Sequence, residues 1–229
     1  MPAGPTVRIA LAMGTPELAD EPFETTLKDG TRVRFRPIRP EDKRWLQRGI
    51  QELSPESRYR RFFAPVDHLS EEQLRYFTEV DQVDHVAWLG TLADSKDGRV
   101  VAVARFICLP DVPEAAEAAV TVLDEFQGRG LGRAMLVVIT RKAIERGVKR
   151  FTMFVLVENE AMMGLLHDAG AVSDGMHDGV YQMHVDLPER VEDLDRSPAP
   201  KILRAAAAGK LHGETAPGAL STRFLVGKR

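Results

Sequence analysis

The chain has 229 residues, of which 28% are charged, and its formal net charge is −3. This length suits one large domain with appendages or two small ones, and the near-neutral charge disfavours nucleic acid or an anionic membrane as a partner. The single cysteine, Cys108, excludes an intrachain disulfide framework, and no apolar run reaches the roughly 20 residues that cross a bilayer. We therefore expect a cytoplasmic location.

The first third of the chain predicts an arm followed by a strand and three helices. Residues 1–30 are rich in Pro, Gly, Ala and acidic side chains, which indicates an N-terminal arm, with a minor strand as an open alternative. Residues 31–39 alternate polar and apolar in the manner of a strand. Helices are predicted over 40–53, from 54 to 63 and over 70–79, each with a proline or serine start signal. In the second helix, three aromatic side chains are expected to face inward: Tyr59, Phe62 and Phe63.

The rest of the chain predicts a sheet with two further helices. Strands are expected at 85–92, 100–108, 118–123, 151–157 and 180–185, and helices at 129–147 and 160–168. The strand at 151–157 is almost wholly apolar, so we expect it to be central and covered on both faces. The order of elements is not an even alternation, which favours an α+β fold with one mixed sheet. We predict an arm at 1–30, one domain at 31–187 and a tail at 188–229 with a short helix near 200–209.

Three alternate glycines mark the junction between the strand at 118–123 and the helix after it. They are Gly128, Gly130 and Gly132. Glycine lets the backbone adopt unusual dihedral angles and approach a ligand closely. A helix N-terminus also offers free N–H groups and the positive end of a dipole to an anion. The junction therefore predicts a phosphate-binding loop.

The common nucleotide and metal motifs do not fit this chain. The third glycine of a dinucleotide fingerprint is missing, since position 133 is Arg, and no Gly-Lys-Ser/Thr follows as in a P-loop. The six histidines form no His-x-x-x-His pair, and one cysteine cannot build a zinc site. We expect no metal.

The pattern Gln127-x-x-Gly130-x-Gly132 resembles the acyl-CoA-binding motif of the GNAT N-acetyltransferase superfamily, and the order of elements over about 31–187 is similar to that family. The resemblance implies a mixed, mostly antiparallel central sheet flanked by helices, with acetyl-CoA as the acyl donor. Backbone groups of Thr121 and Val122 would pair with the pantetheine arm, and the Val122 N–H would polarise the thioester carbonyl. The remaining expected CoA-binding residues are Gln127, Gly128, Arg129, Gly130, Leu131, Gly132, Arg133 and Asn159.

Residues 53–63 and 79–85 resemble the acetyltransferase domains of bacterial Pat-type protein lysine acetyltransferases. Those enzymes act on lysines of proteins such as acyl-CoA synthetases. The resemblance implies an N-acetyltransferase that acts on a primary amine, with a protein lysine as one candidate acceptor. A small-molecule amine acetyltransferase and a non-catalytic acetyl-CoA-binding module remain alternatives, and a homodimer formed through the last strand and the tail is left open.

Glu117 is the candidate general base, since Pat-like domains carry an acid at this place, and Glu114 is the alternative. The family's usual tyrosine, which protonates the leaving thiolate, is replaced by Leu166. His167 is adjacent, but neighbouring helix positions point about 100° apart, so it is not a simple substitute. The arginines at 58, 60 and 61 could meet the 3′-phosphate of CoA or an acidic protein, or could form a solvated helix face.

Overall fold

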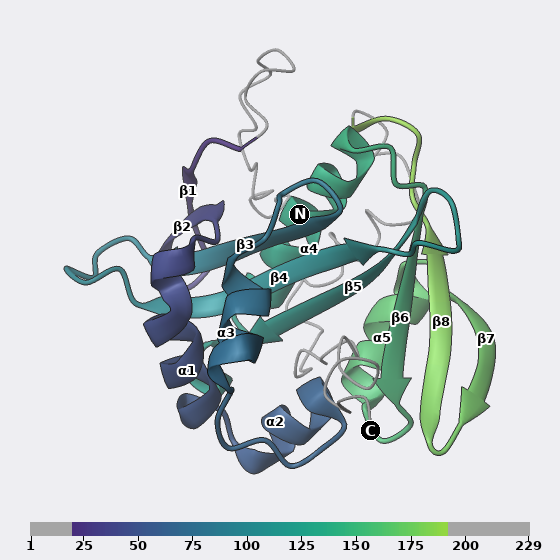
Figure 1. The fold of residues 1–229 in the computed structure, drawn as a ribbon, viewed down its shortest axis with the longest axis horizontal. Coiled ribbons are helices and arrows are strands. Elements are labelled where there is room, and N and C mark those ends of the chain that lie inside the picture. Colours follow the sequence, from purple (N-terminus) through teal and green to yellow (C-terminus); the bar gives the residue numbers. More distant parts are fainter. Residues whose placement is uncertain (1–19, 192–229) are drawn as a thin grey trace, which may run out of the picture.

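A computed structural model describes residues 20–191 of the chain. Its centre is one sheet of eight strands in the spatial order β1-β2-β3-β4-β5-β6-β8-β7 (Figure 1). All neighbours are antiparallel except β5 and β6, which are parallel. The strands are β1 (Phe23–Thr26), β2 (Arg32–Pro37), β3 (His85–Leu92), β4 (Val100–Cys108), β5 (Ala115–Val122), β6 (Arg150–Leu156), β7 (Val172–His177) and β8 (Val180–Asp186). The predicted α+β class with a mixed, mostly antiparallel sheet is confirmed.

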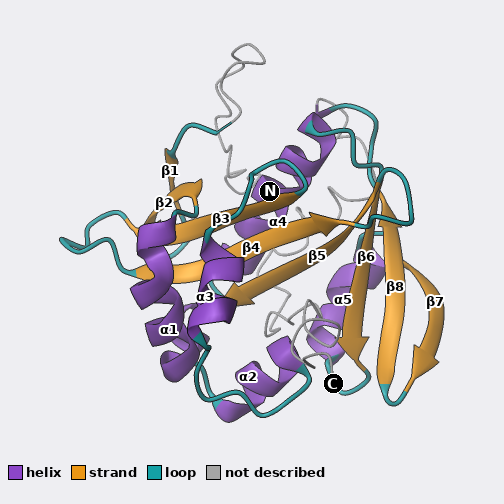
Figure 2. Ribbon diagram, in the orientation of Figure 1, coloured by secondary structure: helices purple, strands orange, loops and turns teal. Residues whose placement is uncertain are grey.

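The sheet lies between helices (Figure 2). α1, α2 and α3 lie on one face and α4 on the other. The helical elements are η2 (Pro40–Asp42), α1 (Lys43–Glu52), α2 (Pro55–Phe62), α3 (Glu71–Thr78), η3 (Asp124–Phe126), α4 (Leu131–Glu145) and α5 (Glu160–Asp168). No helix within residues 20–191 is long and apolar enough to cross a bilayer.

Local capping sets where the helices on the first face begin. The hydroxyl of Ser54 accepts the N–H of Ser57 at 3.1 Å, and Pro55 occupies the first helical position of α2. Ser70 and Gln73 form a reciprocal capping box at the start of α3. The predicted starts of these helices are therefore confirmed.

The inward aromatic stripe predicted for α2 is wrong in part. Phe62 is buried, but Tyr59 is 46% exposed. Phe63 ends the helix in the left-handed region, with φ 54°, and is only half-buried. The short helix turns Tyr59 toward solvent, so Phe62 alone of the three is a core residue.

Strand boundaries differ from the prediction at several points. β1 lies inside the segment predicted as an arm, where a minor strand was the open alternative, and β5 begins at Ala115 rather than at 118, so Glu117 lies within the strand as its third residue. β6 is buried on one face only, because Thr152 and Phe154 on the other face are half-buried. β7 was not predicted. The helix expected near 200–209 lies outside the described residues.

The strand β8 is not an edge strand. It pairs with β6 on one side and with β7 on the other. Its backbone is therefore already used within the sheet, and a second copy of the chain could not pair with it. The outer side of β7 is the free edge at this end of the sheet.

Candidate active site

β5 and β6 pair only at their N-terminal ends. The paired residues are Ala115 with Arg150, Ala116 with Phe151 and Glu117 with Thr152. Beyond Glu117, β5 continues along β4 and β6 continues along β8, and the two strands diverge toward their C-terminal ends (Figure 1). Residues 118–122 of β5 therefore form a sheet edge that β6 does not cover, which we call the open edge.

The register of β5 decides which backbone groups face the open edge. At one end of the β4–β5 ladder the N–H of Leu123 donates to the carbonyl of Val101 at 3.0 Å, and at the other the N–H of Leu109 donates to that of Ala115 at 2.9 Å. The antiparallel register between them is unbroken. Odd-numbered residues of β5 therefore bond to β4, and even-numbered residues point their N–H and C=O groups the other way.

Val120 and Val122 therefore present their backbone groups to the open edge. Thr121, by contrast, pairs its backbone with Val103 on β4. The expected contact through Val122 is compatible with this register, whereas the backbone of Thr121 is already in use. Val120 takes its place as a candidate, and the alternation of a strand paired on one side is the signal that identifies it.

Glu117 lies at the apex of the open edge, where β5 and β6 separate. Its side chain is on the same face as those of Ala119 and Thr121, which is the face covered by α1–α3. From α2, the buried guanidinium of Arg61 faces this region. Burial lowers the pKa of Arg61 to about 10, and attraction to the Glu117 carboxylate opposes that shift. The candidate base thus lies in the field of a buried cation.

A second buried arginine borders the same region. Arg105 on β4 is 3% exposed, and its Nη1 donates to Nε2 of His85 at 3.0 Å and to the carbonyl of Phe77 at 3.3 Å. Burial lowers the pKa of Arg105 to about 9. Burial, followed by the charge of Arg105, lowers the pKa of His85 to about 3, so the imidazole is neutral and accepts at Nε2. The Tyr76 ring lies 5.1 Å from that of His85, and burial raises the pKa of the Tyr76 hydroxyl.

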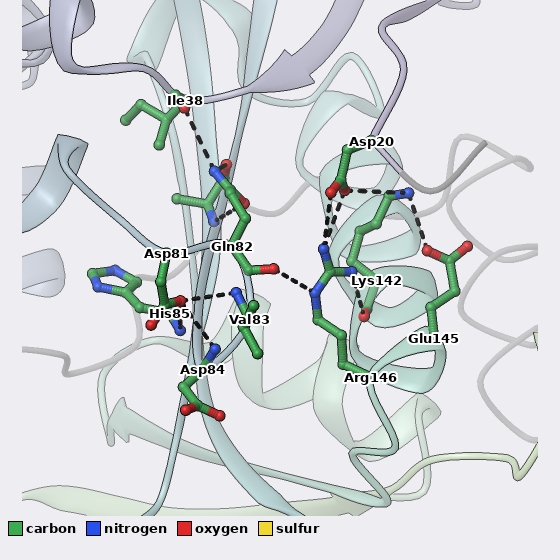
Figure 3. Close-up of polar contacts among 11 residues, drawn as sticks. Asp20, Ile38, Asp81, Gln82, Val83, Asp84, His85, Lys142, Glu145 and Arg146 are labelled. Carbon is green, nitrogen blue, oxygen red and sulfur yellow. Dashed lines mark hydrogen bonds and ion pairs between the residues drawn. The ribbon is translucent and has the colours of Figure 1, made fainter. Parts of the chain in front are cut away.

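His85 is the first residue of β3 and directly follows the turn at residues 81–84 that Figure 3 shows. The Asp81 carboxylate accepts the N–H groups of Val83, Asp84 and His85 at 2.8, 3.0 and 2.9 Å. Burial alone would raise the pKa of Asp81, but these three donors lower it below its ordinary value. The carboxylate therefore folds the segment into a tight turn directly before β3.

Gln82 and Arg146 tie that turn to the rest of the molecule (Figure 3). The Gln82 side-chain amide donates to the carbonyl of Ala87 at 3.2 Å, and its backbone carbonyl accepts from Nε of Arg146 on α4 at 2.7 Å. Arg146 also forms an ion pair with Asp20 at 3.1 Å. Residues 79–85, the second segment that resembles Pat-type domains, thus connect the start of β3 to the end of α4.

The glycine loop leaves the N-terminus of α4 without a side-chain cap. Gly128 and Gly130 adopt positive φ values of 71° and 87°. Gly130 is the N-cap residue and, being glycine, offers no side-chain cap to the first turn. Arg129 turns outward, where it bonds to Asp29 at 3.2 Å. The N–H groups of residues 131–133 are the orphan donors that suit an anion.

Two residues, one in the first turn of α4 and one directly before α5, carry buried donors that have no partner among the described residues. Both Nη atoms of Arg133 on α4 are inaccessible to water, and burial lowers the pKa of Arg133 to about 10. Asn159 is 2% exposed; its Oδ1 accepts the N–H of Met162 at 3.2 Å, which caps α5, and its Nδ2 is left over. Buried donors cost free energy unless they are bonded, so these two residues fit an acceptor-rich ligand such as a CoA diphosphate and pantetheine.

A network behind the loop fixes it to α2. The Asp124 carboxylate accepts the hydroxyls of Ser57 and Ser54 at 2.7 and 3.0 Å and the Ser54 N–H at 2.9 Å. The Gln127 amide donates to the carbonyl of Val122 at 3.1 Å. Gln127 therefore bonds to a carbonyl of the open edge. Ser54 and Ser57 of α2 and its cap hold the loop in place through Asp124.

The structure also places the remaining residues that the sequence singled out. Leu166 is in the hydrophobic core and provides no acid, and His167 is exposed. Arg58 donates to the carbonyl of Leu53, and Arg60 forms an ion pair with Glu56. Of the three arginines on α2, Arg61 interacts with the Glu117 carboxylate. No group of three His, Cys, Asp or Glu side chains within residues 20–191 is arranged to hold a metal ion.

The open edge, the uncapped α4 N-terminus and the carboxylate at the apex together define a fold and site of the acetyltransferase class. Residues 50–171 match the family model described as "Acetyltransferase (GNAT) family", and the chain belongs to this family. The resemblance read from the glycine motif is thereby confirmed.

Curated relatives agree with this assignment. The chain is 33% identical to "Acetyltransferase Pat" of Mycolicibacterium smegmatis over 81% of its own length and 57% of that protein. It is 27% identical to "Acetyltransferase PA5475" of Pseudomonas aeruginosa over 64% of its length and 78% of that protein. The chain thus spans little more than half of the mycobacterial relative.

Solved structures are similar over the same region. The GNAT domain of S. lividans PAT is 34% identical, with a TM-score of 0.67, over 76% of this chain and 100% of that one. A cAMP-binding acyltransferase from Mycobacterium smegmatis is 30% identical, with a TM-score of 0.53, over 83% of this chain and 57% of that one.

Proposed function

We propose that this protein transfers an acetyl group from acetyl-CoA to a primary amine, with a protein lysine as the acceptor and Glu117 as the general base. The observation that carries the proposal is the position of Glu117 at the apex of the open edge. A thioester held along that edge would meet an incoming amine where the carboxylate lies.

The donor would bind along two adjoining surfaces. The N–H groups of residues 131–133 and the guanidinium of Arg133 would hold the diphosphate. The backbone groups of Val120 and the N–H of Val122, whose carbonyl already accepts from Gln127, would pair with the pantetheine arm as an added strand, with Nδ2 of Asn159 as a further donor. An N–H on that edge would polarise the thioester carbonyl.

The reaction would be a direct transfer. Glu117 takes one proton from the ammonium form of the acceptor, the amine nitrogen attacks the thioester carbonyl, and the carbon–sulfur bond breaks to release the CoA thiolate. The second proton, which the nitrogen carries after the attack, leaves as the neutral amide forms and is taken up by the thiolate. A thiol has a pKa near 8.5, so the thiolate leaves without a strong acid, consistent with Leu166 at the usual tyrosine position. Burial raises the pKa of the Cys108 thiol, which disfavours it as an acyl-accepting nucleophile.

A protein acceptor is favoured by the relatives. Two segments of the chain resemble Pat-type domains, and the relatives include proteins named Pat. Acyl-CoA synthetases are the acceptor class to try first. This use of acyl-CoA, with a single cysteine, suits a cytoplasmic location.

The test is release of CoA thiol from acetyl-CoA with the full chain, using acyl-CoA synthetase proteins and a panel of small amines as acceptors. We expect turnover with a protein acceptor and a mass increase of one acetyl group on a lysine. Turnover with small amines alone would redirect the proposal to a small-molecule enzyme. Saturable binding of acetyl-CoA without turnover on any acceptor would favour a binding module.

A further inference from the structure

An apolar cavity of about 70 Å³ lies between the sheet and the helices α1–α3. Its wall includes Trp45, Leu46 and Ile50 from α1. The face of β5 contributes Ala119 and Thr121. The acetyl transfer proposed above makes no use of this space.

Gly49 keeps the cavity wide. It lines the cavity from α1, on the same helical stripe as Leu46 and Ile50, and its φ is not positive. A Cβ atom at this position would meet no heavy atom within 4 Å. A glycine inside a helix costs about 1 kcal/mol relative to alanine. Neither backbone strain nor crowding requires glycine here. The effect of glycine at this position is therefore to leave the cavity larger than any other residue would.

The cavity adjoins the place proposed for the thioester. Ala119 and Thr121 alternate along β5 with Val120 and Val122, whose backbone groups face the open edge. Of Ala119 and Thr121, Ala119 has the smaller side chain facing the cavity. A chain attached to the thioester carbonyl and directed past Ala119 would therefore enter apolar surroundings.

We propose that this cavity binds the aliphatic part of acyl groups longer than acetyl, so that the protein prefers short linear acyl-CoA donors. This inference rests on the proposed function. An apolar cavity of about 150 Å³ holds benzene, so a cavity of 70 Å³ has room for about three carbon atoms. An uncharged chain suits the mainly apolar wall, and succinyl-CoA tests whether the two buried arginines that also line the cavity, Arg61 and Arg105, favour an anionic chain instead.

The experiment measures dissociation constants by calorimetry and kcat/KM by thiol release for acetyl-, propionyl-, butyryl-, hexanoyl- and succinyl-CoA. The full chain is compared with Gly49→Leu and with Gly164→Leu. Gly164 is a matched control, because it is also helical, lies on the exposed side of α5 and has nothing within 4 Å of a Cβ.

Burial of each methylene multiplies affinity about fourfold, so the two extra methylenes of butyryl-CoA should make it bind the unaltered protein roughly fifteenfold more tightly than acetyl-CoA. Gly49→Leu should abolish this preference and leave acetyl-CoA affinity within twofold, whereas Gly164→Leu should change neither. Thermal unfolding checks that both variants fold; if Gly49→Leu does not, Gly49→Ala should give a smaller shift in the same direction.

Three results would overturn the acyl-chain inference and leave the proposed function standing. They are equal affinity for all chain lengths, a butyryl preference that survives in Gly49→Leu, and a preference for succinyl-CoA. A rise in acceptor KM that is equal for every donor in Gly49→Leu would also overturn it, since the cavity would then hold the acceptor. If acetyl-CoA itself neither binds nor turns over, the proposed function fails as well.

Discussion

Thr152 is the last residue of β6 that pairs with β5, and the residue opposite it is Glu117. Both backbone groups of Glu117 face β4, and Thr152 of β6 flanks it on the other side, whereas the next residue of β5 has only β4 beside it among the described strands. The Glu117 carboxylate therefore lies beside a sheet edge that no described strand covers. This arrangement makes Glu117 the first residue to test.

We expect Glu117→Gln to lower kcat more than tenfold while the dissociation constant for acetyl-CoA stays within twofold. Glutamine keeps the size of the side chain but cannot accept the amine proton. Steady-state thiol release and calorimetry measure the two quantities. Glu114→Gln is the matched control, because Glu114 is exposed and forms an ion pair with Lys149 at 2.7 Å. An unchanged kcat in Glu117→Gln would remove it from the mechanism.

Arg133→Met should separate ligand binding from stability. A hydrogen bond to a charged group is worth about 1.5–3 kcal/mol, so loss of the guanidinium should raise the dissociation constant for acetyl-CoA at least tenfold. The free energy of unfolding without ligand should not fall, because the substitution removes a buried charge that has no partner among the described residues.

Arg141→Met is the control for this experiment. Arg141 lies on the same helix and forms an ion pair with Glu145 at 2.9 Å. Its substitution should leave acetyl-CoA affinity unchanged. Equal affinities for all three proteins would mean that the Arg133 guanidinium does not touch the ligand.

The low pKa of His85 in the folded protein predicts that the protein loses stability in acid. Its pKa is about 3 in the folded protein and about 6.5 in the unfolded chain. Between these values the unfolded chain binds a proton that the folded protein does not, so the free energy of unfolding falls as pH falls from 6.5 toward 3. The slope from one such group is at most about 1.4 kcal/mol per pH unit.

Denaturant unfolding between pH 4 and pH 7 measures this slope. His85→Gln should reduce it, because glutamine does not titrate. His177→Gln, at an exposed histidine of β7, should keep the slope of the unaltered protein. Identical slopes in all three proteins would show that His85 is not the group that titrates.

Much of the fold was predictable because it is encoded locally. The caps at Ser54 and Ser70 and the apolar runs of β3, β4 and β6 are contiguous signals. β7 was missed because all six of its residues are exposed, so its sequence has no alternation of buried and exposed positions. Its existence depends on pairing with β8, which is a tertiary contact.

The site was predictable only where one segment carries it. The glycine loop and Glu117 lie within a single stretch of the chain. Arg61, His85 and Arg105 come from α2, β3 and β4 and meet only in the folded protein. The separation of β5 and β6 after Glu117 is likewise a property of the sheet, and no local pattern in either strand announces it.

Asn159→Ser separates two roles of the Asn159 side chain, the cap of α5 and the proposed hydrogen bond from Nδ2 to the ligand. Serine is about as good an N-cap as asparagine, so it can still accept the Met162 N–H that begins α5. It lacks the Nδ2 donor, which is buried without a partner in the part of the chain that the structure describes. We expect the free energy of unfolding without ligand to change by less than about 1 kcal/mol. Acetyl-CoA should bind about fivefold more weakly, the effect of one neutral hydrogen bond.

Asn159→Ala completes this comparison, since it removes the cap and the donor together. Stability without ligand should then fall by about 1 kcal/mol, and acetyl-CoA affinity should fall as far as in the serine variant. Chemical denaturation and calorimetry on the three proteins give both quantities. If the serine variant binds acetyl-CoA as tightly as the unaltered protein, Nδ2 is not a ligand contact, and the role of Asn159 is limited to holding α5 against the end of β6.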